Sequence, residues 1–386
     1  MAFLNFHPND YSVSYGSETV RLLAKEYALL RFLYQHAGRT FTREQLLDQV
    51  WPMEYPGERT VDDHVYRLRK KLKRWSGKIR LATVRGLGYS LIMQDTPVFN
   101  IPSWSDGGLQ QQIAELLDTY QKLGQSRSML ALANQQELLG VNIDTFHLMF
   151  LRFVQADLDW FLHSTEAKDR DKLYWLLVSY YAFYKEPQKC LHYFERAIKA
   201  NIMPFQMQRE LEMLNIIGLY TDNGRIEEDL LKVEEAYRII ERLDGELDSF
   251  KVHVATSEMY IHLKARHVPE AERCSKRIEG MLADAPYLRE ICTYHGLKGR
   301  LLLLQGRRKE ALAAFEHGLE VGEAAHNAPL LVSSVAGTLD FLETVHHDPP
   351  LQRQFQARYD EFERMYGLSG HQQPLERMIE RILDSV

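Results

Sequence analysis

The chain has 386 residues, of which 45% are hydrophobic and 26% are charged, so it is long enough for two or three globular domains. No stretch approaches the ~20 consecutive apolar residues of a membrane-spanning helix, and the first residues lack the basic and apolar segments of a signal peptide. Three widely spaced cysteines exclude a disulfide framework and are consistent with a cytoplasmic protein.

The net charge of −6 is unevenly distributed along the chain. Residues 1–95 carry 15 Lys and Arg against 10 Asp and Glu, whereas the remaining residues carry 32 against 43. Ten basic residues fall between Arg59 and Arg85, where only Asp62 and Asp63 are acidic. A basic segment in an acidic chain indicates a surface that binds a polyanion, although a solvated helix face gives the same pattern.

The first 95 residues predict a small α+β domain. Short strands are expected near 3–6, 11–15 and 19–22, separated by turn residues. Helices are expected at 25–36, at 43–50 after the cap residue Thr42, and from Thr60 onward. A strand pair at 79–84 and 89–93 follows and turns through Arg85-Gly86-Leu87-Gly88.

The third helix has one apolar and one basic face. At 100° per residue, the residues Val61, Val65, Leu68, Leu72 and Trp75 share one stripe, which we expect to pack on the domain core. The opposite face carries mainly long basic side chains, and an α-helix of this kind fits the major groove of DNA. The polar face consists of Asp63, Tyr66, Arg67, Lys70, Lys73 and Arg74.

Three motifs in this region resemble those of the OmpR/PhoB-type winged-helix DNA-binding domains. The first helix has the spacing of Leu23, Glu26, Leu29, Leu30 and Leu33, and the third has R-x-V-D-x-H-V-x-x-L-R-x-K-L from Arg59 to Leu72. The third motif is T-V-R-G-x-G-Y from Thr83 to Tyr89. The resemblance covers residues 3–93 and implies a winged helix-turn-helix domain at 1–95.

The resemblance implies a set of contacts with double-stranded DNA. In that family the third helix enters the major groove, and the wing reaches the minor groove. Arg67 and Arg69 are therefore expected near the bases, Arg85 in the minor groove, and Tyr66 where relatives often have a basic residue. The loop at 51–58 corresponds to the segment with which relatives touch RNA polymerase. The expected phosphate contacts are Arg59, His64, Lys70 and Lys73.

The rest of the chain predicts a different architecture. Residues 96–108 are rich in proline and glycine and are expected to be a linker. From 109 to 386 the pattern is helical, and similar loop-to-helix junctions recur about every 40 residues, near 190, 229, 271 and 311. A repeat of this length predicts an all-α solenoid of helix pairs. The unit resembles a lengthened tetratricopeptide repeat (TPR), and no receiver-like alternation of strand and helix accompanies it.

Such a repeat domain suggests a sensor or dimerisation role. Solenoids bind peptides or protein segments on a concave face, where Tyr181 and Asn215 are candidate ligand contacts. Aromatic residues between 146 and 194 could also line this face, although packing residues have the same helical spacing. The motifs of nucleotide binding, zinc proteases and serine hydrolases do not occur, so we expect neither an enzyme nor a cofactor or metal site.

The sequence therefore predicts a cytoplasmic, sequence-specific transcription regulator that acts as a homodimer. Its repeat domain is expected to bind a signal, such as a short peptide, that modulates DNA binding. The architecture resembles repeat-containing bacterial regulators, including peptide-sensing ones. The alternative is that the repeat domain is a docking scaffold for a protein partner and has no small ligand.

Overall fold

The computed structural model describes residues 4–8, 10–15, 18–51, 57, 59–84, 88–93, 102–184, 186–242 and 248–385. These residues form two compact units, which are described separately below. The first contains residues 1–110 and 134–141, and the second contains residues 111–133 and 142–386. Residues 96–101 of the expected 96–108 linker lie outside the described residues, so the division at 95 and 109 stays a prediction.

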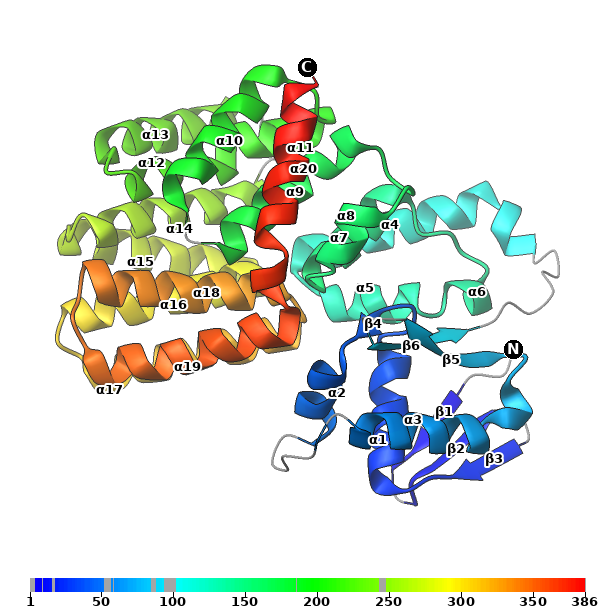
Figure 1. Cartoon of the computed structure of the whole chain (residues 1–386). Coiled ribbons are helices and arrows are strands. Elements are labelled where there is room, and N and C mark those ends of the chain that lie inside the picture. Colours follow the sequence, from blue (N-terminus) through cyan, green and yellow to red (C-terminus); the bar gives the residue numbers. More distant parts are fainter. Residues whose placement is uncertain are drawn as a thin grey trace. The chain divides into compact units, whose positions relative to one another are not determined.

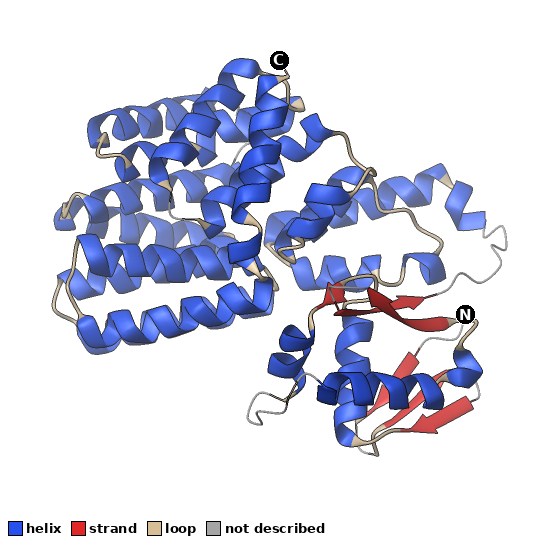
Figure 2. Cartoon of the chain, viewed as in Figure 1, coloured by secondary structure: helices blue, strands red, loops and turns tan. Residues whose placement is uncertain are grey.

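The first unit contains two small antiparallel sheets and, between residues 24 and 71, three helices (Figure 2). One sheet has the order β1-β2-β3, with Leu4 opposite Tyr15 and Ser12 opposite Arg21. The other has the order β4-β6-β5, in which β5 and β6 form the wing hairpin. The bounds are β1 Leu4–His7, β2 Ser12–Tyr15, β3 Glu18–Arg21, α1 Ala24–Gln35, β4 Thr40–Phe41, α2 Arg43–Val50, α3 Arg59–Lys71, the 3-10 turn η1 Lys73–Trp75, β5 Ile79–Val84 and β6 Gly88–Met93.

The core of this unit lies among the three helices and the sheets. Val61, Val65 and Leu68 are fully buried, and Leu72 and Trp75 continue the same apolar stripe. The expected core face of the third helix is therefore confirmed. Because the helix packs with this face inward, its basic face is left at the surface.

Beyond Met93 the described residues contain helices and loops but no strand (Figure 1). None of the described helices is both long and apolar enough to cross a membrane. The bounds are η2 Pro102–Ser105, α4 Gly107–Leu123, α5 Ser126–Ala133, α6 Gln136–Leu139, α7 Thr145–Val154, α8 Leu158–His163, α9 Asp169–Phe183, α10 Pro187–Ala200, α11 Phe205–Glu210, the π-helix η3 Leu211–Asn215, α12 Leu219–Asp222, α13 Ile226–Arg242, α14 Asp248–Lys264, α15 Val268–Asp284, α16 Leu288–Leu304, α17 Arg308–Ala325, α18 Ala328–Thr344, α19 Pro349–Tyr366, η4 Leu368–Gly370 and α20 Gln372–Asp384.

The second unit is an array of antiparallel helix pairs. The four recurring junctions each begin a helix, namely α10, α13, α15 and α17. Each of these helices packs on the helix before it in the chain, and α18 with α19 extends the array. A long all-helical region is therefore confirmed, whereas the designation as a TPR-like solenoid stays a prediction.

The last helix, α20, packs against α9 and α10 at the start of the array (Figure 1). The hydroxyl of Tyr180 donates to Glu376 Oε1 at 2.6 Å, and that of Tyr193 donates to Glu380 Oε1 at 2.8 Å. Helix α18 also packs against α9. These contacts bring helices from both ends of the array together, so the first helices of successive pairs surround a common space.

Candidate nucleic-acid interface and ligand cavity

The surface of α3 presents the polar face that the sequence predicted. Tyr66 has 68% of its surface exposed, because it lies opposite the buried stripe. The Lys and Arg residues of α3 and η1 that are predicted to contact DNA are also exposed, and together they form a long row of donors. A helix with such a face can enter the major groove, where Arg reads guanine and Lys meets phosphates. These basic residues are Arg59, Arg67, Arg69, Lys70 and Lys73.

The start of α3 is held by a network that the sequence analysis missed. The Asp62 carboxylate accepts a hydrogen bond from Arg43 Nε at 2.7 Å and another from the Tyr89 hydroxyl at 2.6 Å. Burial acts to raise the pKa of Asp62, but the bonds from Tyr89 and Arg43 outweigh it and lower this pKa. The network joins α2, α3 and β6, and so fixes the third helix relative to the wing.

A second carboxylate, which is buried, holds the other end of α3. Glu26 is fully buried, and its Oε2 accepts hydrogen bonds from the Leu23 backbone N–H at 2.9 Å and from Lys71 Nζ at 2.6 Å. Arg67 Nε lies 3.6 Å from Glu26 Oε1. Burial opposes ionisation of Glu26, but these donors lower the pKa of its carboxyl. Lys71 therefore anchors α3 to α1 instead of extending the exposed basic face.

His64 and Arg67 form one surface pair. His64 Nδ1 lies 2.7 Å from the Thr60 carbonyl oxygen, so this nitrogen carries the proton and donates. The Trp51 ring packs edge-on against the imidazole, with ring centroids 4.9 Å apart. Arg67 Nη2 lies 3.3 Å from His64 Nε2. The expected base and phosphate contacts are therefore adjacent, and the imidazole orients the guanidinium.

Arg69 is engaged within the domain. Its Nε and Nη2 donate to the Leu81 carbonyl oxygen at 3.0 and 2.7 Å, and Nη2 also donates to Thr83 Oγ1 at 2.7 Å. The guanidinium therefore ties α3 to β5 of the wing. A base contact by Arg69, as the resemblance implies, requires the side chain to give up these bonds.

Two predicted contact regions lie outside the described residues. Arg85, the expected minor-groove residue, belongs to the undescribed turn of the wing. The expected polymerase-contacting loop at 51–58 is described only at Trp51, which is buried, and at Gly57. Both remain predictions.

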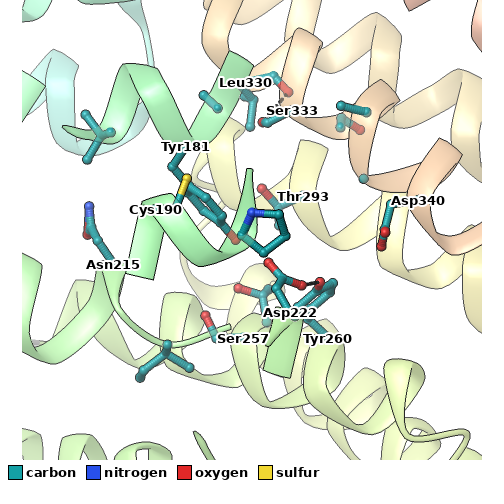
Figure 3. A pocket seen from close by; sticks show the side chains of 18 of the residues that line it. Tyr181, Cys190, Asn215, Asp222, Ser257, Tyr260, Thr293, Leu330, Ser333 and Asp340 are labelled. Atoms are coloured by element: carbon teal, nitrogen blue, oxygen red, sulfur yellow. Dashed lines mark hydrogen bonds between the residues drawn. The ribbon is translucent and has the colours of Figure 1, made fainter. Parts of the chain in front are cut away.

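The second unit contains a cavity of about 400 Å³. Residues of α9, α10, η3, α12, α14, α16 and α18 line it, so it lies inside the helix array. Tyr181 and Asn215, the two predicted ligand contacts, both line this cavity (Figure 3). Asn215 Nδ2 also donates to the Tyr174 hydroxyl at 3.3 Å. The structure brings the two residues to one site, while their role in binding stays a prediction.

Charged side chains in the cavity were not found by the sequence analysis. The Tyr260 hydroxyl donates to Asp222 (Figure 3), and Lys264 Nζ donates to Asp340 Oδ2 at 2.6 Å. Arg300 completes the set from α16. Its position directly before the apolar run Leu301–Leu304 was a usable signal, because a charged residue on a buried helix needs a specific partner.

A buried carboxylate shapes the wall of this cavity. Gly218 has φ of 95°, and its N–H donates to both carboxylate oxygens of Asp229 at 3.0 and 2.9 Å. The Thr221 N–H donates to the same carboxylate at 2.9 Å. A Cβ on Gly218 would lie 3.5 Å from the Tyr260 ring and 3.6 Å from the Tyr181 hydroxyl. This turn therefore sets the start of α12 and the position of Asp222.

A group with metal-ligating atoms lies elsewhere in this unit. Glu258, His262 and Cys274 have potential ligand atoms within 4.8 Å of one another. Arg277 and Tyr237 both donate to the Glu258 carboxylate, and the charge of Arg277 neutralises this carboxylate. Burial raises the pKa of Cys274 to about 12, which favours the thiol over the ligating thiolate. The group is best explained as a packing network.

Comparison with known proteins identifies the kind of domain that the first unit contains. Residues 16–91 match the family described as "Transcriptional regulatory protein, C terminal". The Sensory transduction protein RegX3 of Mycobacterium tuberculosis is 46% identical over 81 residues, which are 20% of this chain and 36% of that protein. The Heme response regulator HssR of Staphylococcus aureus is 42% identical over 77 residues, 20% of this chain and 34% of that protein. The chain thus spans about a third of the length of these relatives.

A solved structure also matches part of this chain. It is the DNA-binding domain of the response regulator AdeR, in complex with an intercistronic region. The match has 30% sequence identity and a TM-score of 0.22, and it covers 24% of this chain and 95% of that chain. From the family match and the relatives, the first unit contains an OmpR/PhoB-type winged-helix DNA-binding domain.

Proposed function

We propose that this protein is a sequence-specific transcription regulator in which α3 and the wing read double-stranded DNA. The observation that carries the proposal is the exposed basic face of α3 within a domain that matches the transcriptional regulatory family. Two carboxylates, the buried Glu26 and the half-buried Asp62, tie this helix to α1, α2 and the wing. A rigidly held helix supports base reading, because register on the groove is then set by the fold.

We also propose that the helical unit binds a signal, in agreement with the sequence-based hypothesis of a peptide-like ligand. The cavity favours this function over a docking scaffold without a small ligand, since a volume of about 400 Å³ lies in the usual range for ligand sites. Its polar lining supplies groups that can orient a ligand. Three free and buried cysteines, Cys190, Cys274 and Cys292, are consistent with action in the cytoplasm.

Homodimerisation is part of the proposal. One winged helix reads only a short half-site, and two linked copies gain affinity through their effective concentration. Binding of a signal is proposed to change how the two DNA-binding domains are presented. Sedimentation of the full chain, free and with its selected DNA, tests this point, and a monomer in both states would contradict it.

Selection from a random DNA library by the full-length protein tests the DNA-binding proposal. At physiological ionic strength we expect enrichment of one motif, arranged as a direct or inverted repeat. A variant with Arg67→Ala is expected to lose the enrichment, whereas Lys309→Ala, on the exposed surface of α17, is the control that keeps it. If neither the full chain nor residues 1–110 enriches a motif, the proposal is wrong.

A further inference from the structure

Arg300 is a buried cation without an ionic partner among the described residues. Only 6% of its surface is exposed, and its Nε has no hydrogen-bond acceptor. Within the described part of the chain, its one hydrogen bond runs from Nη2 to Thr338 Oγ1, at the long distance of 3.5 Å. Burying a guanidinium without an anion is costly, and proteins normally provide a carboxylate or bind an anion there.

The fold makes room for this guanidinium at the cavity. A Cβ on Gly337 would lie 2.8 Å from Arg300 Nη2, so this glycine leaves room for the guanidinium in its observed position. Both residues line the cavity. The geometry therefore keeps a positive charge at the wall of the cavity, where an anion that enters can reach it.

An unpaired negative charge lines the same cavity. Asp222 accepts a hydrogen bond from the Tyr260 hydroxyl but has no ion pair with a described residue. Burial raises its pKa to about 6, and this effect outweighs the hydrogen bond from Tyr260 and the charge of Lys264, which both lower the pKa. Asp340 differs, because Lys264 pairs with it at 2.6 Å. The cavity thus holds one buried charge of each sign that forms no salt bridge with a described residue.

We propose that the cavity binds a small amino-carboxylate zwitterion, an amino acid or a dipeptide, whose carboxylate pairs with Arg300 and whose ammonium pairs with Asp222. This inference rests on the proposed signal-binding function of the helical unit and specifies its ligand class. A zwitterion compensates both charges at once, whereas a phosphate dianion would face Glu186, Asp222 and Asp340 in the same lining. The rings of Tyr181 and Tyr260 offer apolar faces to the ligand side chain.

Thermal unfolding of the full chain with a panel of free L-amino acids and dipeptides tests the proposal. A member of the panel is expected to raise Tm by about 2–4 °C at saturating concentration. The C-terminal amide of this ligand lacks the carboxylate, and its N-acetyl form lacks the ammonium. Each should bind at least about tenfold more weakly than the ligand itself, because each loses one charged contact. Calorimetry of the three forms gives the dissociation constants.

Variants then assign each charge. The Arg300→Met variant is expected to bind the free acid and the amide with equal affinity. The Asp222→Asn variant is expected to bind the free amine and the N-acetyl form with equal affinity. Arg353→Met and Asp284→Asn, both exposed on other faces of the unit, are matched controls that bind as the unchanged protein does. The two variants are independent, so if one fails to fold the other still decides the matter.

Stability without ligand provides a further check. Because the buried charge lacks a partner, Arg300→Met is expected to melt at the same or a higher temperature than the unchanged protein. A panel in which no zwitterion raises Tm, or an amide that binds as tightly as the acid, overturns the inference. None of these measurements involves DNA. A negative result here therefore does not affect the DNA-binding proposal, which the library selection tests separately. A negative library selection likewise does not affect this inference.

Discussion

The Tyr89 hydroxyl of β6 donates a hydrogen bond of 2.6 Å to the Asp62 carboxylate of α3. Arg43 at the start of α2 completes the contact from the other side, with Nε 2.7 Å from the same oxygen. The helix that is proposed to read the major groove and the hairpin that forms the wing are thereby joined at one charged group. Motion of one element relative to the other requires this group to be released.

Removing one hydroxyl tests the importance of this joint. Tyr89→Phe is expected to lower the opening free energy of the α3 amides by about 1–3 kcal/mol, the usual range for hydrogen bonds to charged groups. Native-state hydrogen exchange on the full chain measures it. Tyr66→Phe is the control, because Tyr66 is exposed, and it should leave exchange unchanged. Equal protection in Tyr89→Phe and the unchanged protein would show that the bond is dispensable.

The two arginines predicted to read bases should behave differently. Arg67→Ala is expected to weaken binding to the selected DNA by about 1–3 kcal/mol with less effect on random DNA. Arg69→Ala also removes the bonds to Leu81 and Thr83, so it should lower the Tm of the protein as well as its affinity. Titrations on both DNAs, together with melting curves, separate these effects. If the Arg67→Ala variant loses the same amount of affinity for the selected DNA and for random DNA, base reading by Arg67 is contradicted.

Lys73 is predicted to contact phosphate. Lys73→Ala should weaken binding to selected and random DNA alike and reduce the slope of log K against log salt by about 1. Lys309→Ala, an exposed lysine of the helical unit, is the charge-matched control. Titrations of both DNAs at several salt concentrations test this prediction. A loss of affinity confined to the selected sequence would place Lys73 at a base instead.

Glu26 makes the stability of the first unit dependent on acid pH. Its pKa is lowered in the folded state, so its contribution is present above the ordinary value of 4.5 and is lost as pH falls through the folded pKa. Glu26→Gln should cost about 1–3 kcal/mol at neutral pH, because the Lys71 bond to a carboxylate is lost, and should flatten the acid slope. Denaturant unfolding at pH 3 to 7 tests this expectation. Asp48→Asn, an exposed change on α2, should leave the slope intact.

Asp222 predicts the opposite pH dependence in the helical unit. Its pKa is raised to about 6, so its stabilising contribution is present below its ordinary value of 3.8 and is lost as pH rises through 6. Asp222→Asn should therefore stabilise the ligand-free protein at pH 8 and have little effect near pH 4. His253, whose pKa burial lowers to about 4, titrates in both proteins and cancels in the difference. A difference in Tm that is independent of pH would contradict the unpaired state of Asp222.

Local patterns predicted the elements of the first unit well. The helix at 43–50 and the strand at 79–84 have the predicted bounds, because cap residues and apolar periodicity act within a few residues. The two-residue strand β4 was missed, since its pairing of Thr40 with Ser90 spans the whole domain. The bonds of Arg69 to the wing were missed for the same reason. Helical phase indicates which face a side chain occupies, but not which distant carbonyl it meets.

The helical unit shows the same limit. The recurring junctions predicted where helices begin, and the aromatic stretch around α9 proved to be mainly core, with Phe161 and Tyr180 fully buried. The cavity was not predicted beyond Tyr181 and Asn215, because Asp222, Tyr260 and Arg300 come from three helices that the sequence does not place side by side. The charge of Arg300 on a buried helix was the available signal.

The return of α20 to α9 also has a consequence for how the protein folds. An open array of repeats has mainly local contacts, and it can fold and unravel repeat by repeat from its ends. Here the hydrogen bond from Tyr180 to Glu376 joins residues 196 positions apart. Such a long-range closure raises the contact order and slows folding, but it also couples the repeats into one cooperative transition. Removal of α20 should therefore convert a single sharp unfolding transition into a gradual one.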